Sequence, residues 1–242
     1  MTSALPPDSS RRYARIAGFL YLIIFFGAGF AEGFVRGGLV APGDAAATAA
    51  NIAANPFLFR LGFASDLIAF AADLGVTVLF FLLLRPVSPV LSLVAAAFRL
   101  VGHPAIASIN MLNHYAALQT AQGAGFFSAF GAEQLNQLTL FFMGLHKYGY
   151  LIAGVFFGIH LLLLGYLIYR SELFPGVFGI LLAVAGGGYV IESFGTILHP
   201  AGGAFYTMVV AFTAVLGELS FTAWLLIKGA RSSATRSAPQ KP

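Results

Sequence analysis

The chain has 242 residues, of which 59% are hydrophobic and only 9% are charged. A soluble domain carries about 25% charged residues, so this composition excludes a protein that meets water on all sides and predicts a membrane protein. The formal net charge of +4 gives no sign of nucleic-acid binding, because the basic residues stand mostly at the ends of apolar segments. The absence of cysteine excludes disulfides and thiolate metal sites.

Six apolar segments are each long enough to cross a bilayer core as a helix, which takes about 20 residues. Short connections rich in proline and glycine make consecutive helices antiparallel neighbours. The sequence therefore predicts an all-α fold, a six-helix transmembrane bundle, and leaves open an earlier start of the fourth helix, near Glu133. The segments are residues 13–35, 57–84, 91–118, 138–169, 177–198 and 206–227.

The first loop is expected to hold a helix of its own. Pro42 and Gly43 form a turn, Asp44 is a favourable N-cap, and an alanine-rich run continues until Pro56. We expect a short interfacial helix here, lying on the membrane surface.

Lysine and arginine are distributed unequally between the two sides of the predicted bundle. Arg36, Arg60 and Lys147 lie toward one side, and nine others lie toward the opposite side: Arg11, Arg12, Arg15, Arg85, Arg170, Lys228, Arg231, Arg236 and Lys241. The excess of basic residues predicts a multi-pass protein of the bacterial cytoplasmic (inner) membrane with both termini in the cytoplasm.

The same pattern divides the chain into three parts. Residues 1–12 are predicted to be a cytoplasmic tail, residues 13–228 the membrane domain, and residues 229–242 a disordered basic tail. A cleaved signal peptide is the alternative for the first segment, which the length of its apolar run disfavours.

Charged residues inside the apolar segments need partners. Asp66 and Asp73 share one helix face of the second segment, and the third segment carries a polar stripe of Arg99, His103, Asn110 and His114. At a rise of about 1.5 Å per residue, Asp73 and Arg99 reach the same height in antiparallel neighbours. We predict that they form an ion pair, since an unpaired charge at the bilayer centre costs about 3 kcal/mol.

The other buried polar residues sort into two predicted layers by the same counting of height. Asp66 is expected to reach His103 or His114. The inner layer consists of Arg99, Asp73, His160 and Glu218, and the outer layer of Glu32, Asp66, His114, His146, Glu192 and His199.

The histidines suggest two cofactor alternatives. His103 with His114 and His146 with His160 would allow haem b between two helices, although the two spacings differ, at about 16 Å and about 21 Å. A divalent metal would be held in the outer layer by Glu32, Asp66, His114, His146 and His199, without any local ligand motif. The first interpretation is a protein without a cofactor.

Several stretches resemble a known family. GDAAATAANIAANPFLFRLGFASDL, AAAFRLV, LHKYGYLIAGVFFGIHLLLLGYLIYRS and PGVFGILLAVAGGGYVIESFG are similar to a bacterial membrane-protein family, domain of unknown function 4386. The resemblance extends from about Arg11 to Lys228 and implies the six-helix membrane architecture. It implies no reaction, substrate or site residue.

The sequence carries no complete catalytic signature, so an enzyme is not the favoured interpretation. We expect binding, sensing or passage of a small solute or proton through a buried polar centre, with the lipid bilayer as its surroundings and no nucleic-acid partner. The alternatives are a haem- or metal-dependent membrane enzyme and an accessory structural subunit, in which the buried charges only fix helix packing. The residues expected in the centre are Asp66, Asp73, Arg99, His103, Glu192 and Glu218.

Overall fold

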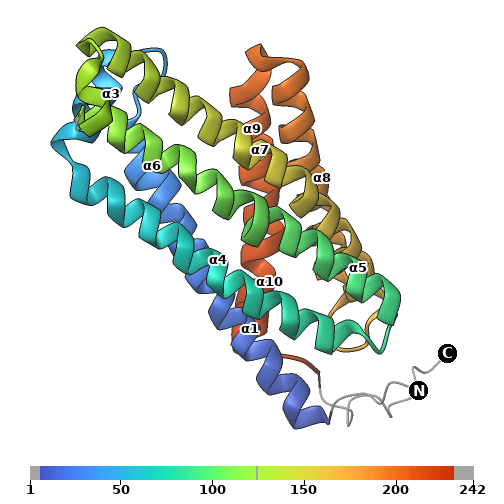
Figure 1. The fold of residues 1–242 in the computed structure, drawn as a ribbon. Coiled ribbons are helices and arrows are strands. Elements are labelled where there is room, and N and C mark those ends of the chain that lie inside the picture. Colours follow the sequence, from blue (N-terminus) through green and yellow to red (C-terminus); the bar gives the residue numbers. More distant parts are fainter. Residues whose placement is uncertain (1–5, 124, 232–242) are drawn as a thin grey trace.

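A computed structural model describes residues 6–123 and 125–231 of the chain, and this part is all helical without strands (Figure 1). Six of its helices are long and apolar enough to cross a membrane. The predicted six-helix architecture is thereby confirmed. These spans are Asp8–Leu39, Pro56–Leu84, Pro89–Gln122, Ala132–Arg170, Gly176–Leu198 and Pro200–Ile227.

Three of the spans are built from several helical segments. The first combines α1 (Pro7–Ala28), η1 (Gly29–Arg36) and α2 (Gly37–Leu39). The third combines α5 (Pro89–Leu100), η2 (Val101–Ala107) and α6 (Ser108–Gln122), and the sixth combines η4 (Pro200–Gly202), α9 (Gly203–Ala214), η5 (Val215–Leu219) and α10 (Ser220–Ile227).

The remaining spans are single helices, namely α4 (Pro56–Leu84), α7 (Ala132–Arg170) and α8 (Gly176–Leu198). A 3₁₀ turn, η3 (Gly125–Ala129), precedes α7. The helices extend beyond several predicted ends: α1 begins at Pro7, inside the expected tail, and α7 begins at Ala132, close to the expected Glu133. Positions 232–242 of the expected C-terminal tail lie outside the described residues.

The short helix of the first loop is present as α3 (Ala45–Ala54). Its N-cap is Asp44, whose carboxylate accepts a hydrogen bond of 2.9 Å from the backbone N–H of Ala47. One face of α3, which includes Thr48 and Ile52, is buried against α6 and α7. The helix lies at the end of the bundle opposite to the start of α1 (Figure 1).

Close helix packing surrounds α7, which is in contact with α5, α6 and α8. Glycines make the contact with α8 possible: a Cβ atom on Gly186 would lie 2.6 Å from the carbonyl oxygen of Gly158 and 2.9 Å from the backbone nitrogen of Leu162. On the other side of the bundle, α1 packs against α4 and α10. Side chains of different spans therefore meet in one shared interior.

The segments η1, η2 and η5 are π-helical. Pro104 lies inside η2 and has no N–H to donate, which explains why the regular α-helical bonding is interrupted there. Short π-helical segments are frequent at functional sites because they turn side chains away from the regular helical phase. Here they carry charged or ionisable residues of the interior, Arg36 in η1, His103 in η2 and Glu218 in η5.

Candidate functional site

The fully buried Arg99 of α5 forms the centre of the polar interior. Its Nε donates a hydrogen bond of 2.9 Å to Oδ1 of Asp73 on α4, and its Nη2 donates to the same oxygen. The predicted ion pair is therefore present, with both side chains at most 1% exposed.

Two further polar groups contact the Arg99 guanidinium. Nη1 donates to the hydroxyl of Tyr21 at 2.7 Å and lies 3.0 Å from Nε2 of His160. The aromatic rings of Tyr21 and Phe157 lie 4.8 and 5.1 Å from the guanidinium carbon, which favours a cation in this place. Arg99 thus contacts polar or aromatic side chains of spans one, two and four.

The second carboxylate oxygen of Asp73 faces η2. Oδ2 lies 3.2 Å from Nδ1 of His103, and the side chain of His103 is 20% exposed. Since Asp73 itself is 1% exposed, His103 is the more accessible member of the pair.

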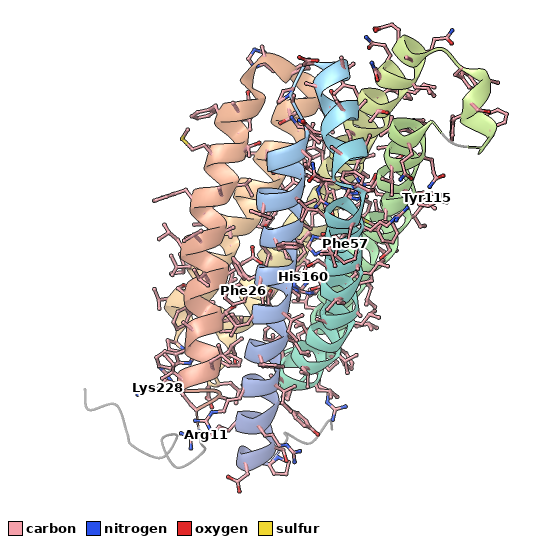
Figure 2. The ribbon with its side chains drawn as sticks, turned by 90° about the vertical axis from the view of Figure 1, so that its left-hand side faces the viewer. Arg11, Phe26, Phe57, Tyr115, His160 and Lys228 are labelled. Carbon is pink, nitrogen blue, oxygen red and sulfur yellow. The ribbon has the colours of Figure 1, made fainter. Side chains whose placement is uncertain are left out.

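Spans five and six complete this group. The hydroxyl of Tyr189 on α8 donates to Oε1 of Glu218 at 3.0 Å, and the ring of Tyr189 packs edge-on against Phe157 at 5.0 Å. All six spans contribute to this group, which we call the Arg99 cluster: Tyr21, Asp73, Arg99, His103, His160, Tyr189 and Glu218. Figure 2 shows its member His160 in the interior, partway along the bundle.

Asp66 does not have the expected histidine partner. It pairs with Arg36, whose Nη1 donates to Oδ2 at 2.6 Å and whose Nη2 lies 3.5 Å from Oδ1. Nε of Arg36 donates to Glu32 at 2.6 Å. The prediction that Asp66 reaches His103 or His114 was wrong because Arg36, counted among the charges outside the spans, is buried and turned inward from η1.

Histidine and tyrosine side chains adjoin this second ion pair. The ring of Tyr150 lies 5.7 Å from the Arg36 guanidinium carbon, and the rings of His146 and Tyr150 are 5.0 Å apart. The rings of His114 and His146 are 5.5 Å apart, and Asn110 donates to the carbonyl oxygen of His146 at 2.7 Å. We call this group the Arg36 cluster: Glu32, Arg36, Asp66, Asn110, His114, His146 and Tyr150.

The two clusters are separated by an apolar layer. Phe70 stands between Asp66 and Asp73 on α4, and it packs in one buried group with Ala107, Met111 and Ala153. The Arg36 cluster reaches the surface through Glu32, whose side chain is 71% exposed. Next to the Arg99 cluster, a cavity of 10 Å³ has His160, Thr77 and Ser92 in its lining. This volume holds about one water molecule.

Two members of the predicted outer layer do not join the Arg36 cluster. Glu192 accepts a hydrogen bond of 2.8 Å from Thr207, and Nδ1 of His199 lies 3.3 Å from the hydroxyl of Tyr206. Both interactions join span five to the beginning of span six. The predicted inner layer fits better, since Arg99, Asp73, His160 and Glu218 all belong to the Arg99 cluster.

The histidines do not fit haem b. Both ring nitrogens of His160 are engaged, Nδ1 at 2.8 Å from the carbonyl oxygen of Ala95 and Nε2 at Arg99. His114 and His146 are 5.5 Å apart and tilted by 69°, with the ring of Phe59 stacked on His114 at 3.8 Å. A macrocycle has no room between rings that are packed in this way.

A divalent metal site is not assembled either. No three histidine, aspartate or glutamate side chains converge within the described part of the chain. Nδ1 of His114 and Nε2 of His146 are buried without a hydrogen bond, so two nitrogen ligands are available at most, and the cationic Arg36 acts on both rings. A buried guanidinium disfavours a second cation beside it.

Sequence reasoning missed four members of the two clusters. Tyr21, Tyr150 and Tyr189 were not among the predicted site residues, although a buried tyrosine hydroxyl needs a partner and thereby signals a polar neighbour. Arg36 was assigned to the outer charges because it follows the first apolar segment directly. Its spacing of four residues from Glu32 would have indicated an ion pair on one helix face.

The fold and the two clusters define a helical, multi-pass membrane protein with ion pairs buried between its spans. More particularly, the chain belongs to the family described as Domain of unknown function (DUF4386), which matches residues 16–229. It is similar to an uncharacterized protein of Archaeoglobus fulgidus, with 34% identity over 167 residues that cover 69% of this chain and 83% of that protein. No solved structure matches the chain. The resemblance to this family is confirmed.

Proposed function

We propose that this membrane protein binds protons in the Arg99 cluster and passes them across the membrane interior. The observation that carries the proposal is the contact of one buried ion pair, Asp73 with Arg99, with two histidines, His103 and His160. Ionisable groups inside membrane spans are candidates for proton relays. A structural pair that only joins two helices has no need of ionisable partners from the other spans.

The small volume beside the cluster favours a proton over a larger solute. The cavity lined by His160, Thr77 and Ser92 measures 10 Å³, whereas small-molecule sites measure about 300 Å³ or more. A proton moves along hydrogen-bonded groups and single water molecules, so it requires no larger space.

His103 is the proposed entry point for the proton. A proton on its imidazole would give Asp73 a second cationic partner at Oδ2, while Arg99 continues to hold Oδ1. Transfer of that proton to Asp73 would remove the carboxylate charge next to Arg99 and leave Glu218, held by Tyr189, as the remaining acid of the Arg99 cluster. Each proton movement would therefore change the attraction between spans two, three and six.

The proposed orientation has both termini in the cytoplasm of the inner membrane. It is supported by the basic residues near the end that carries both termini, among them Arg11, Arg85, Arg170 and Lys228 (Figure 2 labels the first and last). In this orientation the Arg36 cluster and the exposed Glu32 face the external side, and the cavity beside His160 lies on the cytoplasmic side of the apolar layer.

Proton flux into liposomes tests the proposal. The purified full-length protein is reconstituted with an internal pH-sensitive dye, and a potassium diffusion potential drives protons inward. We expect flux above that of empty liposomes, reduced on the order of tenfold or more in Asp73→Asn and in His103→Gln. The exposed Glu133, which accepts a hydrogen bond from Gln137, provides the control Glu133→Gln with unchanged flux.

Thermal stability of each variant is measured in the same detergent to separate misfolding from lost conduction. His103→Gln removes a partly exposed group and leaves the Asp73 pair with Arg99 in place, so it is expected to fold even if Asp73→Asn does not. Wild-type flux equal to that of empty liposomes would refute the proposal, as would an unchanged flux in a folded His103→Gln variant.

A further inference from the structure

The end of α1 near the N-terminus has an exposed, strongly basic face. A shallow, open hollow lies against this helix. The residues that line it follow one another at helical spacing, so they form a single stripe: Asp8, Arg11, Arg12, Arg15, Ile16 and Phe19. The stripe holds three guanidinium groups and only one carboxylate.

Two of the arginines are held by the end of α10. Nε of Arg11 donates to the carbonyl oxygen of Lys228 at 3.5 Å, and Nη2 of Arg15 donates to that of Ile227 at 3.4 Å. These bonds use carbonyl groups that the helix end leaves free, and they bring Lys228 to the same place (Figure 2 labels Arg11 and Lys228). Arg12 is exposed and makes no hydrogen bond with another described residue.

Apolar side chains follow the arginines toward the middle of the bundle. Ile16 is 39% exposed and Phe19 is 59% exposed. Arg11 and Phe19 are eight residues apart, which is about 12 Å along the helix. The stripe therefore changes from cationic to apolar over the depth at which a phospholipid changes from headgroup to acyl chain.

We propose that this stripe is a binding site for an anionic phospholipid. The lipid phosphate would contact Arg11, Arg12 and Arg15, because guanidinium groups match the geometry of phosphate oxygens. The first part of an acyl chain would lie on Ile16 and Phe19. The position of the stripe at the end of a membrane span places these groups where lipid is the available ligand, and the proposal does not depend on proton passage.

Asp8 gives the site a feature that a general attraction to membranes lacks. Its carboxylate lines the hollow beside the arginines and opposes an anionic ligand. Removal of this charge by Asp8→Asn is expected to strengthen binding up to about fivefold, whereas Arg12→Gln is expected to weaken it about fivefold. Arg12→Gln leaves the bonds of Arg11 and Arg15 to α10 intact, so folding is preserved.

Lipid binding is measured on the full-length protein in detergent micelles. Dioleoyl phosphatidylglycerol is titrated against dioleoyl phosphatidylcholine, with bound lipid counted by native mass spectrometry and stability followed by thermal unfolding. We expect preferential binding of phosphatidylglycerol, lowered by Arg12→Gln and by Phe19→Ser and raised by Asp8→Asn. Arg170→Gln, an exposed arginine at the same end of the bundle, is the matched control and should leave binding unchanged.

Three results would overturn the proposal. Equal binding of the two lipids would remove the role of the anionic headgroup. An equal loss in Arg170→Gln and Arg12→Gln would reduce the effect to general attraction by net charge. Inorganic phosphate that displaces the lipid at equal concentration, together with unchanged binding in Phe19→Ser, would make the stripe a site for a free anion and not for a lipid.

Discussion

The buried pair of Asp73 and Arg99 allows a quantitative prediction. Asp73→Asn would leave Arg99 fully buried with neutral partners alone, namely the new amide oxygen, the Tyr21 hydroxyl and His160. Removal of one member of a buried ion pair typically costs 3–5 kcal/mol because the other charge stays buried and uncompensated. We therefore expect Asp73→Asn to lower the free energy of unfolding by about 3–5 kcal/mol.

The reverse change, Arg99→Met, should be milder. Asp73 keeps Nδ1 of His103 at 3.2 Å, and a protonated imidazole can take over part of the compensation. In the double variant neither charge is buried alone, and replacement of a whole buried pair by apolar groups is often neutral. The double variant should thus be no less stable than Asp73→Asn, so the coupling energy should be at least as large as the cost of Arg99→Met alone.

Unfolding in mixed micelles, with increasing fractions of a denaturing detergent and helicity as the signal, measures these differences. The control cycle combines Arg99→Met with Glu133→Gln, an exposed residue at the far end of α7, and should be additive to within about 0.5 kcal/mol. A coupling energy below this limit for Asp73 and Arg99 would refute the idea that the two charges compensate each other in the interior.

Other changes test the packing, the first loop and the second cluster. Gly186→Ala should destabilise the contact of α7 with α8 by about 1–3 kcal/mol in thermal unfolding. Gly187→Ala, whose new methyl group would meet no atom of a neighbouring helix within 4 Å, should be neutral or slightly stabilising. Equal effects of the two changes would contradict the close contact between α7 and α8. Asp44→Ala should lower stability by about 1 kcal/mol through loss of the N-cap of α3, and an increased rate of hydrogen exchange at the start of that helix would identify the cause. Asp66→Asn should lower the free energy of unfolding by about 3 kcal/mol or more, because Arg36 loses its buried carboxylate partner. Glu32, which is 71% exposed, is not expected to compensate fully for this loss. A variant as stable as the wild type would contradict this prediction.

The fold was predictable because two physical quantities sufficed for it. Apolar length gave the six spans, and a constant rise of about 1.5 Å per residue gave the equal height of Asp73 and Arg99. The predicted N-cap at Asp44 required only local chemistry. Each of these predictions depends on a property of one segment or of two adjacent antiparallel helices.

The partner of Asp66 could not be found in this way. The regular counting of helix faces fails inside η1, where π-helical turns hold more residues than α-helical turns, and Arg36 is long enough to reach back into the interior. Pro104 lies within η2 and marks that segment in the sequence, but no comparable signal marks η1 or η5. The tyrosines were missed because their rings add to apolar composition while their hydroxyl groups act as polar partners.

The three π-helical segments also affect how the chain can tolerate changes in its length. Because such a segment accommodates a residue more than a regular turn, deletion of one residue inside it can return the span to ordinary α-helix without displacing the rest of the bundle. The side chains inside the former π-helical segment would then shift by up to about 100° around the helix axis, whereas those of the flanking turns would keep their direction. A chain with a shortened η2 or η5 is expected to fold, but with His103 or Glu218 turned out of its present contacts. Single-residue gaps at these places would therefore distinguish relatives that keep the buried polar network from relatives that lack it.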